Sequence, residues 1–422
     1  IPVLVLLLMG WHRRWTADDA FVNFRVVKEL RHGHGFVFNP GDRVEAGTSP
    51  LWIVVLSILD LFTPIPLEWI AALAALLMSA LALWITIDTA TRLQSSTAGS
   101  PSTLLPVGAL IYCVVPAAWD YATSGLENGL GILWLAVSWS MLVGPATGST
   151  LPTRRSRGWL LLVLGIGPLI RPDFMIFTVV LGAAALLDGP RARRALLRGA
   201  ATVLALPVIA EIIRIAYFGV LAPNPAVAKE AGLSHSPQGW RYLRDFLGPY
   251  ALLVPLALVV IILAISTTRA AKQRDRLRLI VLVEVAAFLH LSYVVRIGGD
   301  FMHARLLLPS FFLALAPIAL LRIDGWRLPV YAALVLWAMV CATALRPGYS
   351  KNRSELAMDA IDQRSHISDE RVVHVRLSGR ANPVTLADFR SNFWGRGGAQ
   401  MDWAIRQGLA TGLILDSESA GN

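Results

Sequence analysis

Long apolar segments alternate with short polar loops along most of the chain. A membrane-spanning helix needs roughly 20 mainly apolar residues, and shorter helices can persist inside a bundle. The pattern predicts an all-α polytopic membrane domain over residues 1–346. Its eleven expected spans lie at about 1–10, 67–90, 104–118, 128–144, 158–170, 174–188, 199–218, 249–266, 279–297, 306–321 and 328–345.

The polar residues 11–66 are expected to form the first extracytoplasmic loop. Within this loop, residues 16–32 repeat apolar positions at helical spacing, which predicts an amphipathic helix with Thr16 as its N-cap. A second apolar stretch, residues 51–61, is short for a span. We expect it to form a helix lying at the outer membrane interface.

The hydropathy collapses from about residue 347 onward. Residues 347–422 are polar, and the pattern at 369–377 is typical of a strand, so a small extracytoplasmic α/β region is expected. Seventy-odd residues are few for a self-sufficient core. The region is therefore expected to be an incomplete part of a larger extracytoplasmic domain.

Composition and charge support a membrane protein and give its orientation. The chain is 55% hydrophobic and 16% charged, whereas soluble domains are about 25% charged. The net charge of +10 gathers in short loops, which favours placing those loops in the cytoplasm and argues against nucleic acid as a partner. These loops are 91–103, 145–157, 189–198, 267–278 and 322–327. Cys113 and Cys341 lie in apolar segments and are expected to be buried thiols.

Asp18 and Asp19 are the candidate catalytic residues. Carboxylates in the first turn of a helix are common, and helix capping could explain one of them. Two in sequence, just after a span, indicate chemistry at the membrane surface. Such a carboxylate could deprotonate a hydroxyl, act as a nucleophile, or hold a divalent cation against a phosphate.

Further polar side chains recur in the loops expected on the same outer side. Charges near spans are costly and usually line a cavity, although solvated or snorkelling side chains are the simpler explanation for any single one. The candidate substrate-binding residues are Arg25, Glu45, Thr123, Ser124, Glu127, Arg171, Asp173, Lys229, Arg296, Asp300, His303 and Arg305. Of these, Arg171, Lys229, Arg296 and Arg305 are candidates for binding a lipid-linked phosphate.

Other titratable residues receive simpler interpretations. His32 and His34 could ligate a metal, but no supporting ligand spacing appears, so loop histidines are preferred and no metal-binding residue is assigned. Glu211 with Arg214, and Glu284 with His290, are expected to pair between helices. A divalent cation remains open as a cofactor, and no P-loop or Rossmann fingerprint is visible.

Several motifs together resemble the AftB family of actinobacterial terminal arabinofuranosyltransferases. They occur in the family's order and cover nearly the whole chain. They are RRWTADD (13–19) with the loop that follows, YATSGLENGL (121–130), IRPDF (170–174), PNPAVAKEAG (223–232), RIGGDFMHARLLLP (296–309) and GRANPVTLADF (379–389).

The resemblance implies a GT-C membrane glycosyltransferase on the outer face of the plasma membrane. It implies a decaprenyl-phospho-arabinofuranose donor and an arabinan acceptor in arabinogalactan and lipoarabinomannan, capped with terminal β-(1→2) arabinofuranose. The lipid bilayer is the expected environment, and a monomer is expected. Asp18 would be the principal carboxylate, supported by Asp19. In the usual GT-C scheme this carboxylate is a base for inverting transfer. The family's donor and product are both β-linked, which implies net retention, and in that case Asp18 would act as a nucleophile or stabilise an oxocarbenium-like ion pair. The sequence leaves both roles open.

Two alternatives remain at the level of sequence. One is a GT-C enzyme that uses another polyprenyl-phosphate sugar, such as mannose. The other is a polyprenyl-lipid transporter, which predicts charges at mid-membrane and inverted repeats. The sequence concentrates charge at the outer side and shows no repeat, so it favours an enzyme.

Overall fold

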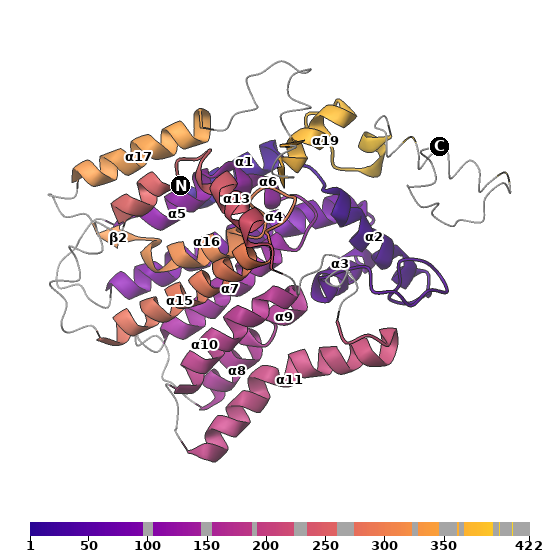
Figure 1. Cartoon of the computed structure of the whole chain (residues 1–422), viewed down its shortest axis with the longest axis horizontal. Helices are drawn as coiled ribbons and strands as arrows, with labels where there is room; N and C mark the ends of the chain where they lie inside the picture. Colours follow the sequence, from indigo (N-terminus) through magenta and orange to yellow (C-terminus); the bar gives the residue numbers. More distant parts are fainter. Residues whose placement is uncertain are drawn as a thin grey trace.

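The fold is almost entirely helical (Figure 1). The computed structural model describes residues 1–95, 104–144, 154–187, 192–222, 234–259, 274–322, 328–345, 361–362 and 367–390, with the isolated residues Arg396 and Gln407. Its α-helices are α1 (Pro2–His12), α2 (Asp18–Arg31), α3 (Pro50–Leu61), α4 (Leu67–Ser95), α5 (Val107–Val114), α6 (Pro116–Tyr121), α7 (Asn128–Val143), α8 (Arg154–Leu164), α9 (Gly167–Ile170), α10 (Met175–Leu187), α11 (Arg193–Phe218), α13 (Ser236–Leu247), α15 (Arg274–Arg296), α16 (Leu308–Leu315), α17 (Leu328–Thr343) and α19 (Glu370–Ser378).

The strands and 3₁₀ helices of the described residues are short. Strand β1 (Leu104–Leu105) pairs antiparallel with β2 (Leu321–Arg322), and β3 (Ile361–Asp362) pairs antiparallel with β4 (Ile367–Ser368). The 3₁₀ helices are η2 (Pro172–Phe174), η3 (Ala316–Ile318) and η5 (Leu386–Phe389). The C-terminal part described here is thus a small mixture of strand and helix.

Helices α4 and α7 form the most extensive helix pair at the centre of the molecule (Figure 1). Gly129 allows the two backbones to approach, because a Cβ atom there would lie 2.3 Å from the carbonyl oxygen of Ala75. Helix α1 packs on α4, α16 packs on α7, and α15 joins α10 to α16. Helix α11 lies along one edge of the molecule.

Among the described residues, three helices are long and apolar enough to cross a membrane: Leu67–Gln94, Arg193–Phe218 and Leu277–Arg296. Shorter apolar helices, including α1, α7, α10 and α17, accompany them. Helix α11 leaves large apolar side chains such as Ile212 and Ile213 about 60% exposed. Lipid would cover these side chains at no hydrophobic cost. The chain is therefore a mostly helical membrane protein.

Some predicted spans are not continuous helices. The segment 104–118 divides into β1, α5 and α6, because Pro116 begins a new helix after Val115 adopts an extended conformation. The segment 158–170 is divided between α8 and α9. The segment 249–266 lies partly outside the described residues.

Two local predictions were wrong. Helix α2 has Ala17, not Thr16, at its N-cap position, and the Thr16 hydroxyl instead donates to the carbonyl oxygen of Val384 at 2.7 Å. Residues 369–377 form the N-cap and most of helix α19, not a strand. The Asp369 carboxylate accepts from the Val372 N–H and caps this helix, and Gly379 ends it at φ 67°. These two end signals outweigh the β-propensity of the valines between them.

Candidate active site

The loop that precedes helix α7 positions the start of α2, where Asp18 and Asp19 lie. The Ala17 N–H donates to the Ser124 carbonyl oxygen at 2.9 Å, and the Trp52 indole donates to the Gly125 carbonyl oxygen at 2.9 Å. Gly125 adopts φ 79°, and a Cβ atom there would lie 2.9 Å from the Cβ atom of Ala20. The TSG motif is therefore a backbone support for α2.

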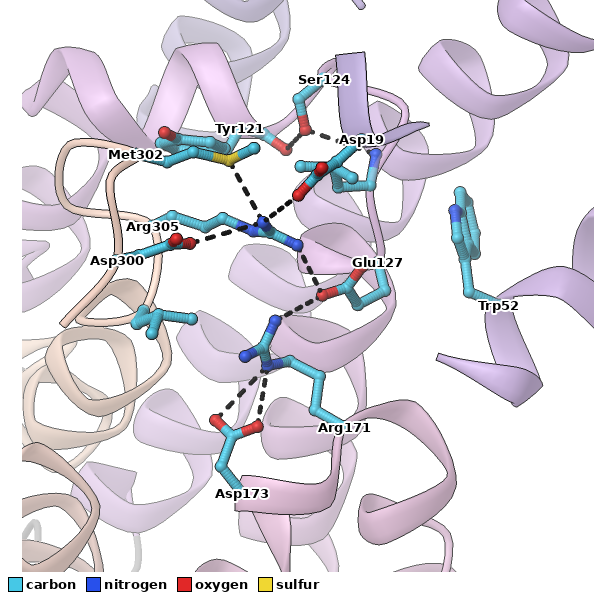
Figure 2. A network of polar contacts seen from close by, with 12 residues as sticks. Asp19, Trp52, Tyr121, Ser124, Glu127, Arg171, Asp173, Asp300, Met302 and Arg305 are labelled. Atoms are coloured by element: carbon cyan, nitrogen blue, oxygen red, sulfur yellow. Dashed lines mark hydrogen bonds and ion pairs between the residues drawn. The ribbon is translucent and has the colours of Figure 1, made fainter. Parts of the chain in front are cut away.

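Arg305 connects the acidic pair to the rest of the site (Figure 2). Its guanidinium lies 3.4 Å from Asp19 Oδ2, 3.2 Å from Glu127 Oε1 and 3.5 Å from Asp300 Oδ2. The Arg305 side chain is only 6% exposed, so these contacts replace most of its water. Carboxylates from three of the loops predicted on the outer side thus contact the buried guanidinium of Arg305.

The network continues from Arg305 through Glu127 to Arg171 and Asp173 (Figure 2). Arg171 shares Glu127 Oε1 with Arg305, at 2.6 Å, and contacts Asp173 at 3.0 Å. His290 Nε2 lies 2.9 Å from Asp173 Oδ2, and its Nδ1 lies 2.7 Å from the Ser310 hydroxyl. His290 therefore pairs with Asp173, and its predicted pairing with Glu284 was wrong.

Proximity of unlike charges sets the protonation of this network. Burial raises the pKa of Glu127, but Arg305 and Arg171 outweigh burial and hold that pKa below its usual value. Burial likewise raises the pKa of Asp173, but Arg171 and His290 outweigh burial, and the pKa of Asp173 lies well below its usual value. Both carboxyl groups are therefore ionised at neutral pH.

The C-terminal segment completes the other side of the acidic pair. The Thr16 N–H donates to the Pro383 carbonyl oxygen at 2.9 Å, and Arg371 Nε donates to the Arg13 carbonyl oxygen at 2.7 Å. The backbone N–H of Asp18 donates to Glu370 Oε1 at 3.2 Å. These contacts dock α19 against the start of the first loop.

Asp18, Glu370 and His374 form a compact group. Ligand atoms of all three lie within 4.8 Å of one another. Asp18 is exposed, whereas Glu370 and His374 are 5% and 4% exposed. Burial raises the pKa of Glu370 well above its usual value and the nearby Asp18 raises it further, while burial lowers the pKa of His374.

A small cavity of about 10 Å³ adjoins this group, and Trp15, Asp120, Tyr121, His303, Glu370 and Arg371 contribute to its wall. His303 is held by Tyr250, whose hydroxyl lies 2.9 Å from His303 Nε2, and by Asp245 at Nδ1. Arg13 forms a two-pronged ion pair with Asp120, with distances of 2.7 and 2.8 Å. The wall of the cavity therefore combines charged side chains with the rings of Trp15 and Tyr121.

The remaining predicted residues lie apart from this network or outside the description. Arg25 pairs with Glu29 at 3.0 Å, Glu45 pairs with Arg214 at 3.0 Å, and Arg296 is exposed. Arg214 also contacts Glu211 within α11, so this pair does not join two helices as predicted. Lys229 and its motif lie outside the described residues.

The loop hydroxyls and thiols are buried. Thr123 is 1% exposed, and its hydroxyl has no hydrogen-bond partner in the described part of the chain. The hydroxyl of Ser124 lies 3.4 Å from the Tyr121 carbonyl oxygen. Cys113 and Cys341 are free and buried, which confirms that prediction.

Sequence reasoning missed several polar residues of the site, among them Arg13, Asp120, Glu370 and His374. The spacing of Glu370 and His374 in the sequence could have indicated their proximity, since residues four apart share a face of a helix. That signal was hidden because a strand was expected there. Arg13 and Asp120 are 107 residues apart, and no local pattern indicates their pairing.

The fold and the site together define a helical membrane protein with a carboxylate-rich polar site at one end of its bundle. Two curated proteins are similar to it, and both are named terminal β-(1→2)-arabinofuranosyltransferase. The Corynebacterium glutamicum protein is 34% identical over 365 residues, which cover 80% of this chain and 53% of that protein. The Mycobacterium tuberculosis protein is 34% identical over 429 residues, which cover 91% of this chain and 66% of that protein.

These relatives confirm the resemblance predicted from the motifs. The chain spans between about half and two thirds of their length. No family model matches the chain, and no solved structure matches it significantly.

Proposed function

We propose that the protein is a GT-C glycosyltransferase that transfers arabinofuranose from decaprenyl-phospho-arabinofuranose to the ends of cell-wall arabinan. The product would be a terminal β-(1→2) linkage. The observation that carries this proposal is the acidic pair at the N-terminus of α2, in contact with a buried network of unlike charges. The similarity to two named arabinofuranosyltransferases supports the sugar.

The two aspartates have different surroundings, which suggests different roles. Asp18 is exposed, so its carboxylate, of which Oδ1 accepts the Asp19 N–H at 2.7 Å, is accessible to a substrate. Asp19 contacts Arg305, which Glu127 and Asp300 hold in place. We assign the reacting carboxylate to Asp18, as nucleophile, ion-pair stabiliser or base. Asp19 and Arg305 would orient the sugar beside it.

A larger cavity suggests where the lipid donor binds. Its volume is about 350 Å³, and its wall includes Met9, Trp119, Cys341 and Ala342 together with Arg13 and Arg371. An apolar wall beside guanidinium groups suits an isoprenoid chain that ends in a phosphate. Arg371 also contributes to the wall of the small cavity beside Glu370, so the two spaces are neighbours.

The proposed topology follows the charge of the loops. The chain would cross the plasma membrane eleven times, with residues 11–66 and the C-terminal region on the periplasmic side. This orientation places the basic loops in the cytoplasm. It also brings the acidic pair to the side where a cell-wall acceptor is available.

A transfer assay tests the proposal. The chain, purified in detergent, is given synthetic decaprenyl-phospho-arabinofuranose and a short arabinan acceptor, and the linkage of the product is determined. Asp18→Asn is expected to lower the rate by about 10²- to 10⁴-fold, because the reacting carboxylate is lost. Asp42→Asn, at an exposed loop position, is the matched control and should leave the rate unchanged.

Two results would contradict the assignment. One is full transfer by an Asp18→Ala/Asp19→Ala variant that unfolds at the wild-type temperature. The other is transfer from a polyprenyl-phospho-mannose donor without transfer from the arabinofuranose donor, which would identify a different sugar.

A further inference from the structure

Helix α19 presents two potential metal ligands to the exposed carboxylate of Asp18. Glu370 and His374 are four residues apart and therefore share one face of the helix. Their ligand atoms and that of Asp18 lie within 4.8 Å of one another. Since Zn²⁺ holds nitrogen and oxygen ligands at about 2.1 Å, small side-chain adjustments would close this group around one ion.

The two buried members of the group each carry a polar atom without a partner. Glu370 Oε2 and His374 Nδ1 form no hydrogen bond with any described residue, although both side chains are at least nine-tenths buried. Buried polar atoms are nearly always paired, and each unpaired one calls for an explanation such as a bound water or ion. Of the three residues, Glu370 also contributes to the wall of the small cavity, which has about the volume of one water-sized particle.

The two carboxyl groups of this cluster also lack a neutralising partner. Asp18 and Glu370 lie side by side, and neither forms an ion pair with Lys or Arg among the described residues. A divalent cation bound between them would offset the repulsion of two carboxylates.

We propose that Asp18, Glu370 and His374 form a binding site for a divalent transition-metal ion, Mn²⁺ or Zn²⁺. Two carboxylates and one imidazole suit these ions better than Mg²⁺, which prefers oxygen ligands and retained water. Three protein ligands leave at least one coordination position open. If the proposed function is right, the phosphate of the lipid donor could bind at the open position. Without a metal ion, the carboxylates would repel this phosphate.

The test measures metal binding without any substrate. The chain is purified without a polyhistidine tag, treated with chelator and titrated with Mn²⁺ under electron paramagnetic resonance. Thermal unfolding with Mn²⁺ and with Zn²⁺ is followed in parallel. We expect about one tightly bound Mn²⁺ per chain and a higher unfolding temperature with metal, because only the folded state assembles the ligands.

Two variants and one matched control make the test specific. Glu370→Gln keeps the size of its side chain, and His374→Asn leaves a smaller polar group, so the double variant should weaken Mn²⁺ binding by at least about tenfold. Asp18→Asn should also weaken it, and its exposed position keeps the fold intact should the buried double substitution unfold the chain. His32→Ala/His34→Ala removes a surface histidine pair whose rings lie 6.1 Å apart, and it should leave the affinity unchanged.

Three outcomes would overturn the site. They are absence of Mn²⁺ and Zn²⁺ binding to folded wild-type protein, equal affinity in folded Asp18→Asn, and loss of binding in the His32/His34 variant. The proposed function fails separately. Metal binding without arabinofuranosyl transfer would leave the site standing, and chelator-resistant transfer without metal binding would leave the function standing.

Discussion

Arg305 shows how a single residue organises the site. Its side chain is almost fully buried, and it contacts carboxylates from the start of α2, from the end of the loop before α7 and from its own loop. Burial lowers the pKa of Arg305, but Glu127 and Asp300 outweigh burial and raise it. The guanidinium stays charged and holds three chain segments in one geometry.

Removing Arg305 should therefore cost stability as well as activity. Arg305→Ala leaves buried Glu127 with one cation instead of two, and breaking a buried ion pair typically costs about 3–5 kcal/mol. Thermal or denaturant unfolding in detergent measures the loss. Arg31→Ala, which breaks an ion pair whose arginine is 56% exposed, should cost no more than about 1 kcal/mol. Equal losses in the two variants would show that Arg305 contributes little to stability.

At the level of single residues, the sequence predicted which charged residues belong to the site. It did not predict which of them contact one another. Asp19, Glu127, Arg171, Asp173, Asp300 and Arg305 were all predicted as site residues from their loops, and the structure brings them into one network. Their partners could not be predicted, since contacts such as Arg305 to Asp19 join residues 286 positions apart. For the same reason, the sequence grouped His290 with Glu284, six residues away.

Among the elements, the loop after α15 depends on two consecutive glycines. Gly298 and Gly299 adopt φ values of 95° and 79°, and this left-handed backbone turns the chain towards Asp300 and Arg305. A Cβ atom on Gly299 would lie 2.3 Å from the ring of Tyr242 on α13. The Tyr242 hydroxyl in turn donates to the Met302 carbonyl oxygen at 2.8 Å. The turn at Gly298 and Gly299 therefore packs closely against helix α13.

A pair of substitutions separates this steric fit from backbone strain. Gly299→Ala should destabilise the protein clearly more than Gly33→Ala, because both glycines have positive φ but only Gly299 faces a close neighbour. The unfolding temperatures of the two purified variants give the comparison. A Gly33→Ala variant as unstable as Gly299→Ala would mean that strain alone limits both positions.

Secondary structure was predicted correctly where the apolar pattern alone determined it. The prediction failed where helix-capping residues opposed the β-propensity of the residues between them. The amphipathic pattern of residues 16–32 corresponds to helix α2, and residues 51–61 correspond to α3. Residues 369–377 contain Val372 and Val373, which favour a strand, but an aspartate cap and a terminal glycine form a helix there. The distinction matters, because the helix brings Glu370 and His374 to one face.

On the scale of the whole molecule, the orientation in the membrane decides which substrates the site can meet. The basic loops predict that the start of α11 lies in the cytoplasm and that residues 11–66 lie outside. Both native cysteines are buried, so added cysteines can be labelled with little background.

Cysteine labelling tests this orientation. A membrane-impermeant maleimide should label Asp42→Cys in intact cells, and should label Arg194→Cys only after the membrane is permeabilised. Both positions are exposed in the structure. The reverse labelling pattern would move the acidic pair to the cytoplasm and exclude a periplasmic acceptor.

The overall class of fold could be predicted, whereas the docking of the C-terminal segment could not. Apolar periodicity is a local property, so it reveals helices and a membrane environment directly. The contacts of α19 with the first loop join polar residues more than 350 positions apart, as in the bond from Asp18 to Glu370. Such pairings follow from the completed bundle, which positions the two segments.

The docking of α19 has a consequence for the order in which the protein matures. The ribosome makes the acidic pair near the start of this chain, but the residues that hold it, Glu370, Pro383 and Val384, are synthesised more than 350 residues later. A nascent chain with most of its helices already in the membrane still lacks one wall of its site. In the proposed orientation, the site would be complete only after the late segment has crossed the bilayer and folded back onto the first loop.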